Sequence, residues 1–223
     1  MDNLRNIYEQ TKYILLQKIK ELFENDCSGH DYWHSLRVLN NAEKIAKTEK
    51  CDEYIVMIAA LLHDTDDIKI YETRDYENAR RIMLDCHLTV STIERVIDII
   101  REISFKGTET VSPKSIEGKI VQDADRLDAM GAIGIARAFA YGGNHNRAIH
   151  IPDCQPNMNM DETEYRNHEG TTINHFYEKL IFIKDMMNTD CAKSIAWKRD
   201  NQSQSHSAGT HTTADFNHIC IRG

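Results

Sequence analysis

The sequence is poor in residues that interrupt helices. Its 223 residues include only three prolines and ten glycines, and no Asn-Gly pair or repeated apolar-polar alternation signals a β-hairpin. Apolar side chains instead recur at helical spacing, as on the broad stripe of residues 4–23. Because apolar residues make up 41% of a chain of this length, we expect one all-α domain with a single core.

Three further absences narrow the class of protein. The N-terminal segment carries both charge signs and lacks the uninterrupted apolar run of a signal peptide or membrane span. The six cysteines form no CxxC pair, which favours reduced thiols over a secreted disulfide scaffold. The chain has a net charge of −8, so it lacks the excess of basic residues found in proteins that coat nucleic acids. We therefore expect a cytoplasmic protein whose partners include neither a nucleic-acid polymer nor a membrane.

Helical patterns and capping residues outline the elements. Asp31 and Asp52 are predicted N-caps of two helices, of which the first carries His34 and the second ends near His63. Further helices are expected over about 73–85, 88–104, 115–140 and 170–198.

Two segments depart from this helical pattern. Residues 142–168 are polar and contain two adjacent glycines and two prolines, which predicts a long loop. From residue 201 the helical periodicity is lost. We therefore expect residues 1–200 to form one compact domain and residues 201–223 to be a poorly packed, atypical tail.

Four positions carry metal-binding side chains inside apolar helical stretches. They are His34, the adjacent pair His63 and Asp64, and Asp125. Imidazole nitrogens and carboxylate oxygens are ligands that divalent cations accept, and polar groups are costly to bury without a partner. A lone histidine is more often structural, and a His-Asp dipeptide often arises by chance. The combination of all four residues carries the prediction of a metal site.

The segments around these residues extend the pattern. HDYWHSLRV, ALLHDTDDIK, ISFKG, DADRLDAMGAIGIARAF and HFYEKLIFIKDMMNT, spread over residues 20–200, resemble the HD-domain metal-dependent phosphohydrolases, whose ordered signature is H…HD…D. Within that superfamily they look like a bacterial-type branch that includes nucleotide pyrophosphohydrolases. The resemblance implies that His34, His63, Asp64 and Asp125 are the metal ligands.

The resemblance also implies one divalent cation. Two-metal members of the superfamily insert extra histidines between the doublet and the last aspartate, where this chain has only His87. Two imidazoles and two carboxylates leave an octahedral ion with open positions for water or a phosphate oxygen, whereas zinc tends to close a four-ligand set into a tetrahedron. Manganese, magnesium, iron, nickel or cobalt are therefore expected in preference to zinc.

Two residues after the doublet are candidates for catalysis. Asp67 resembles the acidic residue that follows the doublet in the family, and it would orient or deprotonate the attacking water. Lys69 would neutralise phosphate charge. The alternative is a solvated loop after the helix, and we expect Asp66 to be exposed there.

Four residues are candidates to bind the substrate. Arg37 lies one turn after His34 and shares its helical face, so it is a phosphate ligand, a partner of a ligand carboxylate or an ordinary surface arginine. His175 and Lys179 are four residues apart and would project together toward the β or γ phosphates of a nucleotide. Their alternative is an exposed face formed by Glu178 and Lys179. Lys106, just past an expected helix end, is the fourth candidate.

The resemblance implies hydrolysis of a small phosphorylated metabolite, with a nucleoside triphosphate split to monophosphate and pyrophosphate as the first choice. A nucleotide phosphomonoesterase is the nearest alternative. A catalytically degenerate metal- or nucleotide-binding sensor is a third, because residues 201–223 stand where the family has an apolar stretch. A homodimer is an open option.

Overall fold

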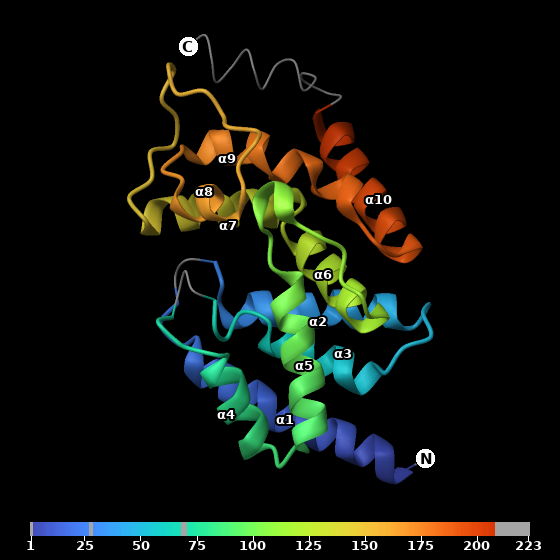
Figure 1. The fold of residues 1–223 in the computed structure, drawn as a ribbon. Helices are drawn as coiled ribbons and strands as arrows, with labels where there is room; N and C mark the ends of the chain where they lie inside the picture. Colours follow the sequence, from blue (N-terminus) through green and yellow to red (C-terminus); the bar gives the residue numbers. More distant parts are fainter. Residues whose placement is uncertain (1, 27–28, 68–70, 208–223) are drawn as a thin grey trace. The chain divides into compact units, whose positions relative to one another are not determined.

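The computed structural model describes residues 2–26, 29–67 and 71–207, and every regular element within these ranges is helical (Figure 1). The expected all-α class is thus confirmed. The elements, in chain order, are α1 (Asp2–Leu22), α2 (Tyr32–Ala46), α3 (Glu53–Leu62), α4 (Glu77–Asp85), α5 (Val90–Ile103), the 3-10 helix η1 (Gly107–Glu109), α6 (Ile116–Asp128), α7 (Gly131–Asn144), α8 (Glu162–Asn167), α9 (Thr172–Glu178), the 3-10 helix η2 (Leu180–Met186) and α10 (Asp190–Ser207).

The chain divides into two compact units, and the boundary between them falls within α6. The first unit comprises Met1–Phe105 and Thr110–Asp125, and the second comprises Lys106–Glu109 and Arg126–Gly223. In the first unit α3 packs against α1, α2 and α5. All residues of α3 from Ile55 to Leu62 are buried, as expected for a central helix that is apolar on every side.

Side-chain caps fix where α2 and α3 begin. The Asp31 carboxylate accepts a hydrogen bond from the His34 backbone N–H at 2.8 Å. The Asp52 carboxylate accepts one from the Ile55 backbone N–H at 3.3 Å. Both predicted N-caps are confirmed, and both bonds satisfy a donor that has no partner within the helix.

The continuous helix expected over 115–140 is wrong, because the chain turns between α6 and α7. Met130 is extended, with φ of −105° and ψ of 155°. Gly131 follows with φ of 72°, a conformation that a side chain would strain. The apolar pattern runs on through this turn without a proline, so helical periodicity alone did not reveal it.

The loop expected over 142–168 contains a short helix, α8. Asp161 accepts a hydrogen bond from the Glu164 backbone N–H at 2.8 Å, and the Glu164 side chain accepts one from the Asp161 backbone N–H at 3.1 Å. This is a capping box, whose sequence signature is an Asp or Ser followed three residues later by Glu. That local signal was available in the sequence and was overlooked.

The single helix expected over 170–198 is also wrong, since α9, η2 and α10 occupy this region. Lys179 leaves the helical region with φ of −143°, and Met187 is extended. The Thr189 hydroxyl then accepts a hydrogen bond from the Ala192 backbone N–H at 3.3 Å, which favours a new helix start. The last helix continues to Ser207, past the expected boundary at residue 200. Residues 208–223 lie outside the described residues, so the packing of the tail stays a prediction.

Arginines connect the helices of the second unit. Arg199 on α10 donates to the Leu127 carbonyl at the end of α6, and Arg126 donates to the Met186 carbonyl at the end of η2. Arg137 on α7 pairs with the buried Asp128 at 3.1 Å. Cationic side chains at helix C-termini satisfy carbonyls and complement the helix dipole, so these contacts stabilise the packing of α10 and α7 with the end of α6.

The expectation that Asp66 is exposed is wrong, because its carboxylate caps α4 from a distance. Asp66 is 9% exposed, and its two oxygens accept hydrogen bonds from the backbone N–H groups of Asn78 at 2.9 Å and Ala79 at 2.8 Å. The Asn78 side chain returns a bond to the Thr65 carbonyl at 2.9 Å. Tyr76, the residue before α4, has φ of 58° and offers no side-chain cap. Asp66 therefore takes over the capping role for this helix.

Replacing Asp66 with asparagine should destabilise the fold by about 2 kcal/mol, because one of its two charge-assisted hydrogen bonds would become a donor-donor contact. Urea denaturation followed by circular dichroism measures this change. The matched control is Asp98→Asn, since the side chain of Asp98 is 69% exposed and should cost less than about 0.5 kcal/mol. Equal stability of both variants would contradict the capping role.

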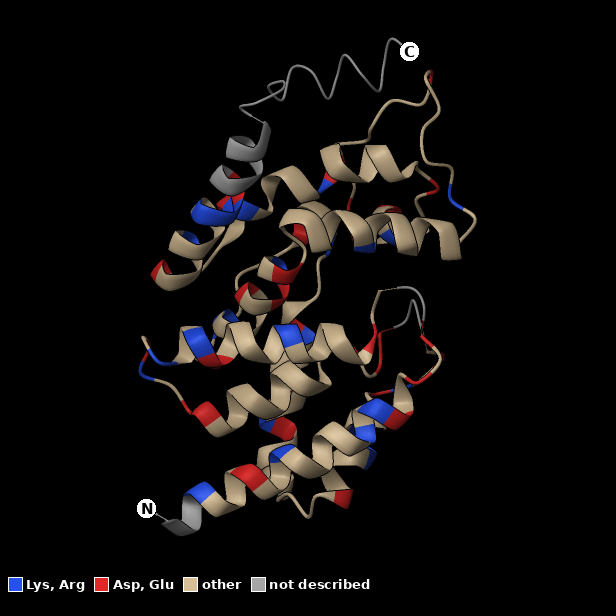
Figure 2. Ribbon diagram, turned by 180° about the vertical axis from the view of Figure 1, so that it is seen from behind, with Lys and Arg blue, Asp and Glu red and all other residues tan. Residues whose placement is uncertain are grey.

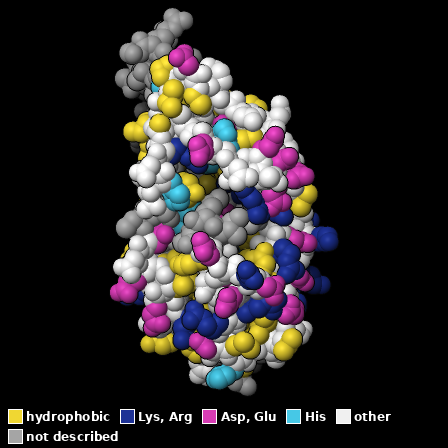
Figure 3. Space-filling model, turned by 60° about the vertical axis from the view of Figure 1, so that its left-hand side comes forward, with side chains coloured by type: hydrophobic (Ala, Val, Ile, Leu, Met, Phe, Trp, Pro, Cys, Tyr) yellow, Lys and Arg dark blue, Asp and Glu magenta, His cyan; other side chains and the backbone are white. Residues whose placement is uncertain are grey.

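Acidic and basic side chains are mixed along the described part of the chain. Both charge signs occur along α1 (Figure 2), and acidic and basic side chains are mixed on the face shown in Figure 3. Within residues 2–26, 29–67 and 71–207, none of the helices combines the length and apolar character needed to span a bilayer. Four of the cysteines, Cys51, Cys86, Cys154 and Cys191, are free thiols.

Candidate metal centre

The first predicted ligand, His34, is fully buried in the first turn of α2. It lies on the face that α2 buries, together with Ser35, Val38 and Leu39. The Asp31 cap holds the backbone of His34 directly, because its carboxylate accepts the His34 N–H. The start of the helix and the position of this imidazole are therefore set by one local interaction.

The doublet lies where α3 ends. His63 is the C-cap residue of α3, and its Nδ1 atom is 2.9 Å from the Ala60 carbonyl. A carbonyl oxygen can only accept, so Nδ1 carries the proton and donates it. With a metal ion bound, the imidazole would be neutral and would present an unprotonated Nε2 atom to the ion. Asp64 follows at the end of the helix and is buried with it.

The structure brings all four predicted ligands together within the first unit. His34 Nε2 is 3.1 Å from His63 Nε2, 3.1 Å from Asp64 Oδ2 and 3.5 Å from Asp125 Oδ1. His63 Nε2 is 3.3 Å from Asp64 Oδ1 and 3.8 Å from Asp125 Oδ1. The Asp125 side chain is 41% exposed, so the cluster is buried on the histidine side and open to solvent at Asp125.

These separations fit one cation. Donor atoms bound at about 2.1 Å lie about 3.0 Å apart at a right angle and about 3.4 Å apart at the tetrahedral angle. The separations given above run from 3.1 to 3.8 Å, close to this range, and the donor atoms of His34, His63 and Asp125 form one group that could hold an ion. His87 lies outside this cluster, in the turn after α4 with φ of 56°.

The electrostatics of the cluster favour positive charge between the carboxylates. Burial acts to lower the pKa of His63, but the Asp64 and Asp125 carboxylates outweigh it and raise the pKa to about 9. Burial likewise acts to raise the pKa of Asp64, but the charges of His63 and His30 and the hydrogen bonds from His30 and His34 hold it well below its usual range. A divalent cation would supply the positive charge that these carboxylates favour.

Known proteins share a large part of this sequence. The HD domain family model matches residues 32–130, a range that contains all four predicted ligands. The uncharacterized protein YpgQ of Bacillus subtilis is 37% identical, over 82% of this chain and 83% of its own length.

The chain belongs to the HD-domain superfamily of metal-dependent phosphohydrolases.

Solved structures of HD proteins and related chains share the fold. A Lactobacillus plantarum protein has a TM-score of 0.80 at 34% identity, with 94% of this chain and 97% of that chain covered. An HD-superfamily hydrolase from Bacillus thuringiensis has a TM-score of 0.64 at 34% identity, covering 92% and 100%. YpgQ solved in complex with ADP has a TM-score of 0.66 at 32% identity, covering 94% and 95%.

Three other residues predicted to act in the site also belong to the first unit. Asp67 follows the doublet and is half-buried, and its backbone N–H donates to the Asp64 carbonyl at 3.2 Å. Lys69 lies outside the described residues. Arg37 is half-buried on α2, one turn after His34. The roles of Asp67, Lys69 and Arg37 in this HD domain stay predictions.

The remaining predicted residues lie in the second unit. Lys106 Nζ pairs with Glu162 at 3.4 Å. His175 is within α9, but Lys179 is the C-cap residue with non-helical angles, so the expected helical alignment of the two side chains does not extend to Lys179. The alternative of an exposed face at Glu178 and Lys179 is wrong, because the Glu178 side chain is 2% exposed and accepts from His168 at 3.0 Å.

His30 belongs to the cluster, and our reading of the sequence did not single it out. Its Nδ1 atom is 2.7 Å from Asp64 Oδ2, and it forms a second group of metal-binding atoms with His34 and Asp64. A signal was present, since two histidines four residues apart stand at the start of a capped helix. The partner Asp64 is 34 residues further along the chain, and no local pattern links it to His30.

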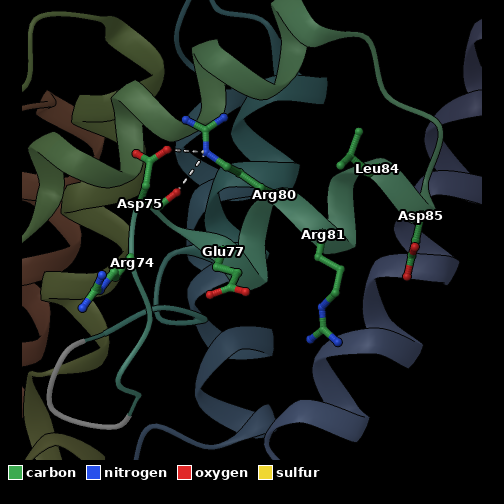
Figure 4. A pocket seen from close by; sticks show the side chains of 7 residues that line it. All are labelled: Arg74, Asp75, Glu77, Arg80, Arg81, Leu84 and Asp85. Atoms are coloured by element: carbon green, nitrogen blue, oxygen red, sulfur yellow. Dashed lines mark hydrogen bonds and ion pairs between the residues drawn. The ribbon is translucent and has the colours of Figure 1, made fainter.

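A separate hollow beside α4 contains none of the predicted site residues. Its lining consists of Arg74, Asp75, Glu77, Arg80, Arg81, Leu84 and Asp85 (Figure 4). Arg80 pairs there with Asp75 at 3.2 Å and also with Glu94 at 2.7 Å. Because acidic side chains balance the arginines, this hollow lacks the net positive charge that a phosphate site requires.

Proposed function

We propose that this HD-domain enzyme hydrolyses a nucleoside triphosphate to the monophosphate and pyrophosphate. The observation that supports the proposal is the cluster of His34, His63, Asp64 and Asp125, in which the donor atoms of His34, His63 and Asp125 all lie within 4.8 Å of one another. A nucleotide substrate is supported by the relative YpgQ, which was solved in complex with ADP.

The ligand set itself supports a particular choice of cation. Two nitrogen and two oxygen donors leave open positions on an octahedral ion, whereas zinc would tend to be enclosed by four ligands. We therefore propose manganese, magnesium, iron, nickel or cobalt in preference to zinc. When bound, such an ion lowers the pKa of a water molecule and polarises a phosphoryl oxygen.

The residues around the cluster complete the proposal. Asp67, half-buried just after the doublet, would accept the proton of the attacking water and fix its direction. Arg37 and Lys69 in the first unit would neutralise charge that builds up on the phosphate oxygens. Lys106, His175 and Lys179 belong to the second unit, and each stays a candidate to bind phosphate.

The test is product analysis with a panel of ribo- and deoxynucleoside triphosphates, supplied with manganese or magnesium. We expect equal amounts of monophosphate and pyrophosphate, and no orthophosphate from monophosphates. Reaction in ¹⁸O-labelled water identifies the bond, because attack on the α-phosphorus labels the monophosphate and attack on the β-phosphorus labels the pyrophosphate. Orthophosphate released from monophosphates would replace this proposal with the phosphomonoesterase.

A further inference from the structure

The position of His30 is fixed from both sides by local structure. Gly29 precedes it with φ of 95°, a conformation that side chains rarely adopt, so the turn that leads into His30 relies on glycine. Asp31 follows it as the N-cap of α2. The His30 ring meets the His34 ring edge to face, with centroids 5.8 Å apart and planes at 82°. His30 is therefore held against a predicted metal ligand rather than directed into solvent.

The contact between His30 and Asp64 is short. His30 Nδ1 is 2.7 Å from Asp64 Oδ2, and the two side chains are 19% and 11% exposed. An ionised carboxylate oxygen only accepts, so His30 Nδ1–H is the donor in this contact. A partly buried, charge-assisted bond of this length strongly restricts the orientation of the acceptor.

That orientation matters because both Asp64 oxygens face the predicted ligands. Oδ2 is 3.1 Å from His34 Nε2, and Oδ1 is 3.3 Å from His63 Nε2. Rotation of the carboxylate about the Cβ–Cγ bond would move both oxygens away from these positions. Groups that hydrogen-bond to metal ligands commonly orient them, and their loss typically weakens metal binding by about 10- to 100-fold.

We propose that His30 is a positioning residue of the metal centre, whose Nδ1–H holds the Asp64 carboxylate in the orientation that binds the cation. This inference rests on the proposed metal centre and adds a residue outside its four-ligand set. His30 acts through Asp64 and needs only a hydrogen-bond donor at the Nδ1 position. The chemistry therefore predicts that another donor at the same position can replace it.

Asparagine provides that donor, because its side-chain nitrogen is as many bonds from Cα as histidine Nδ1. Manganese binding to the full chain is measured without nucleotide, from the electron paramagnetic resonance signal of the free ion. We expect His30→Ala to weaken binding by about 10- to 100-fold and His30→Asn to stay within about threefold of the wild type. His87→Asn removes an exposed histidine outside the cluster and serves as the matched control.

Three results would overturn the proposal. Wild-type affinity in His30→Ala would show that Asp64 needs no support. Equal weakening in His30→Asn and His30→Ala would show that the imidazole itself is required, as in a direct metal ligand. A wild-type chain that binds no manganese would overturn the metal centre as well. Thermal melts without metal check that the variants are folded. The manganese-binding assay contains no nucleotide, so its result can be interpreted even if the protein does not hydrolyse triphosphates.

Discussion

Replacing His63 with asparagine is expected to lower kcat by at least about 10³-fold, which corresponds to ~4 kcal/mol of additional barrier. The asparagine side-chain nitrogen can still donate to the Ala60 carbonyl, which now accepts from His63 Nδ1 at 2.9 Å. The Nε2 atom that faces His34 and the two carboxylates is lost. The variant therefore removes a cation ligand while it retains the hydrogen bond at the end of α3.

The measurement is steady-state hydrolysis of the best triphosphate, with manganese varied over a wide range. His87→Asn is the control, since it also removes an imidazole from the first unit but leaves the cluster intact. We expect wild-type turnover for the control and none for His63→Asn, even at high manganese concentration. If His63→Asn retained more than a tenth of the wild-type kcat while remaining folded, the catalytic cation would have to be held elsewhere.

The parts of the fold that sequence reasoning predicted correctly depend on interactions within one helical turn. The Asp31 and Asp52 caps each bond to a backbone N–H three residues ahead, so residue type and spacing are sufficient to identify them. Helical periodicity likewise predicted α5, whose buried residues include Ile93, Val96, Ile97 and Ile100 at helical spacing. Such signals need no knowledge of the tertiary structure.

The missed features depend on contacts between distant residues or on a single backbone conformation. Asp66 caps α4 through residues 12 and 13 positions away, and His30 meets Asp64 across 34 positions. The turn at Gly131 depends on a φ of 72°, while the apolar pattern continues across it. A sequence pattern shows which residues are present. Which of the distant residues contact each other is seen only in the folded structure.

The four predicted ligands are a different case, because they are also distant in sequence. His34 and Asp125 are 91 positions apart, yet His34 Nε2 and Asp125 Oδ1 are 3.5 Å apart. Neither periodicity nor capping predicts that contact. It was anticipated because the ordered set of residues resembles a known family, and the buried cluster supplies the physical reason for the order. Four polar side chains from α2, the end of α3 and α6 share one small volume, which is favourable when they also share a partner.

Adding manganese should raise the midpoint of thermal unfolding of the wild type by roughly 5–10 °C. A ligand that binds only the folded state at 100 times its Kd stabilises that state by about 2.7 kcal/mol. For a chain of this size each kcal/mol shifts the midpoint by roughly 2–4 °C. The predicted ligands come from α2, the end of α3 and α6, so unfolding of the first unit would separate them and release the ion.

The shift is measured by circular dichroism at 222 nm, with manganese or with a chelator, and compared with Asp125→Asn. Asp125 is the most exposed of the four ligands, at 41% for its side chain, so its replacement should change the melt without metal very little. We expect its metal-induced shift to be small or absent, because a neutral amide oxygen is a weaker ligand than a carboxylate. An equal shift in both proteins would mean that the stabilising ion binds outside this cluster. A shift that is present in the wild type and absent in Asp125→Asn would show that the stabilising cation binds at Asp125. That is the cluster in which His63→Asn is expected to stop catalysis.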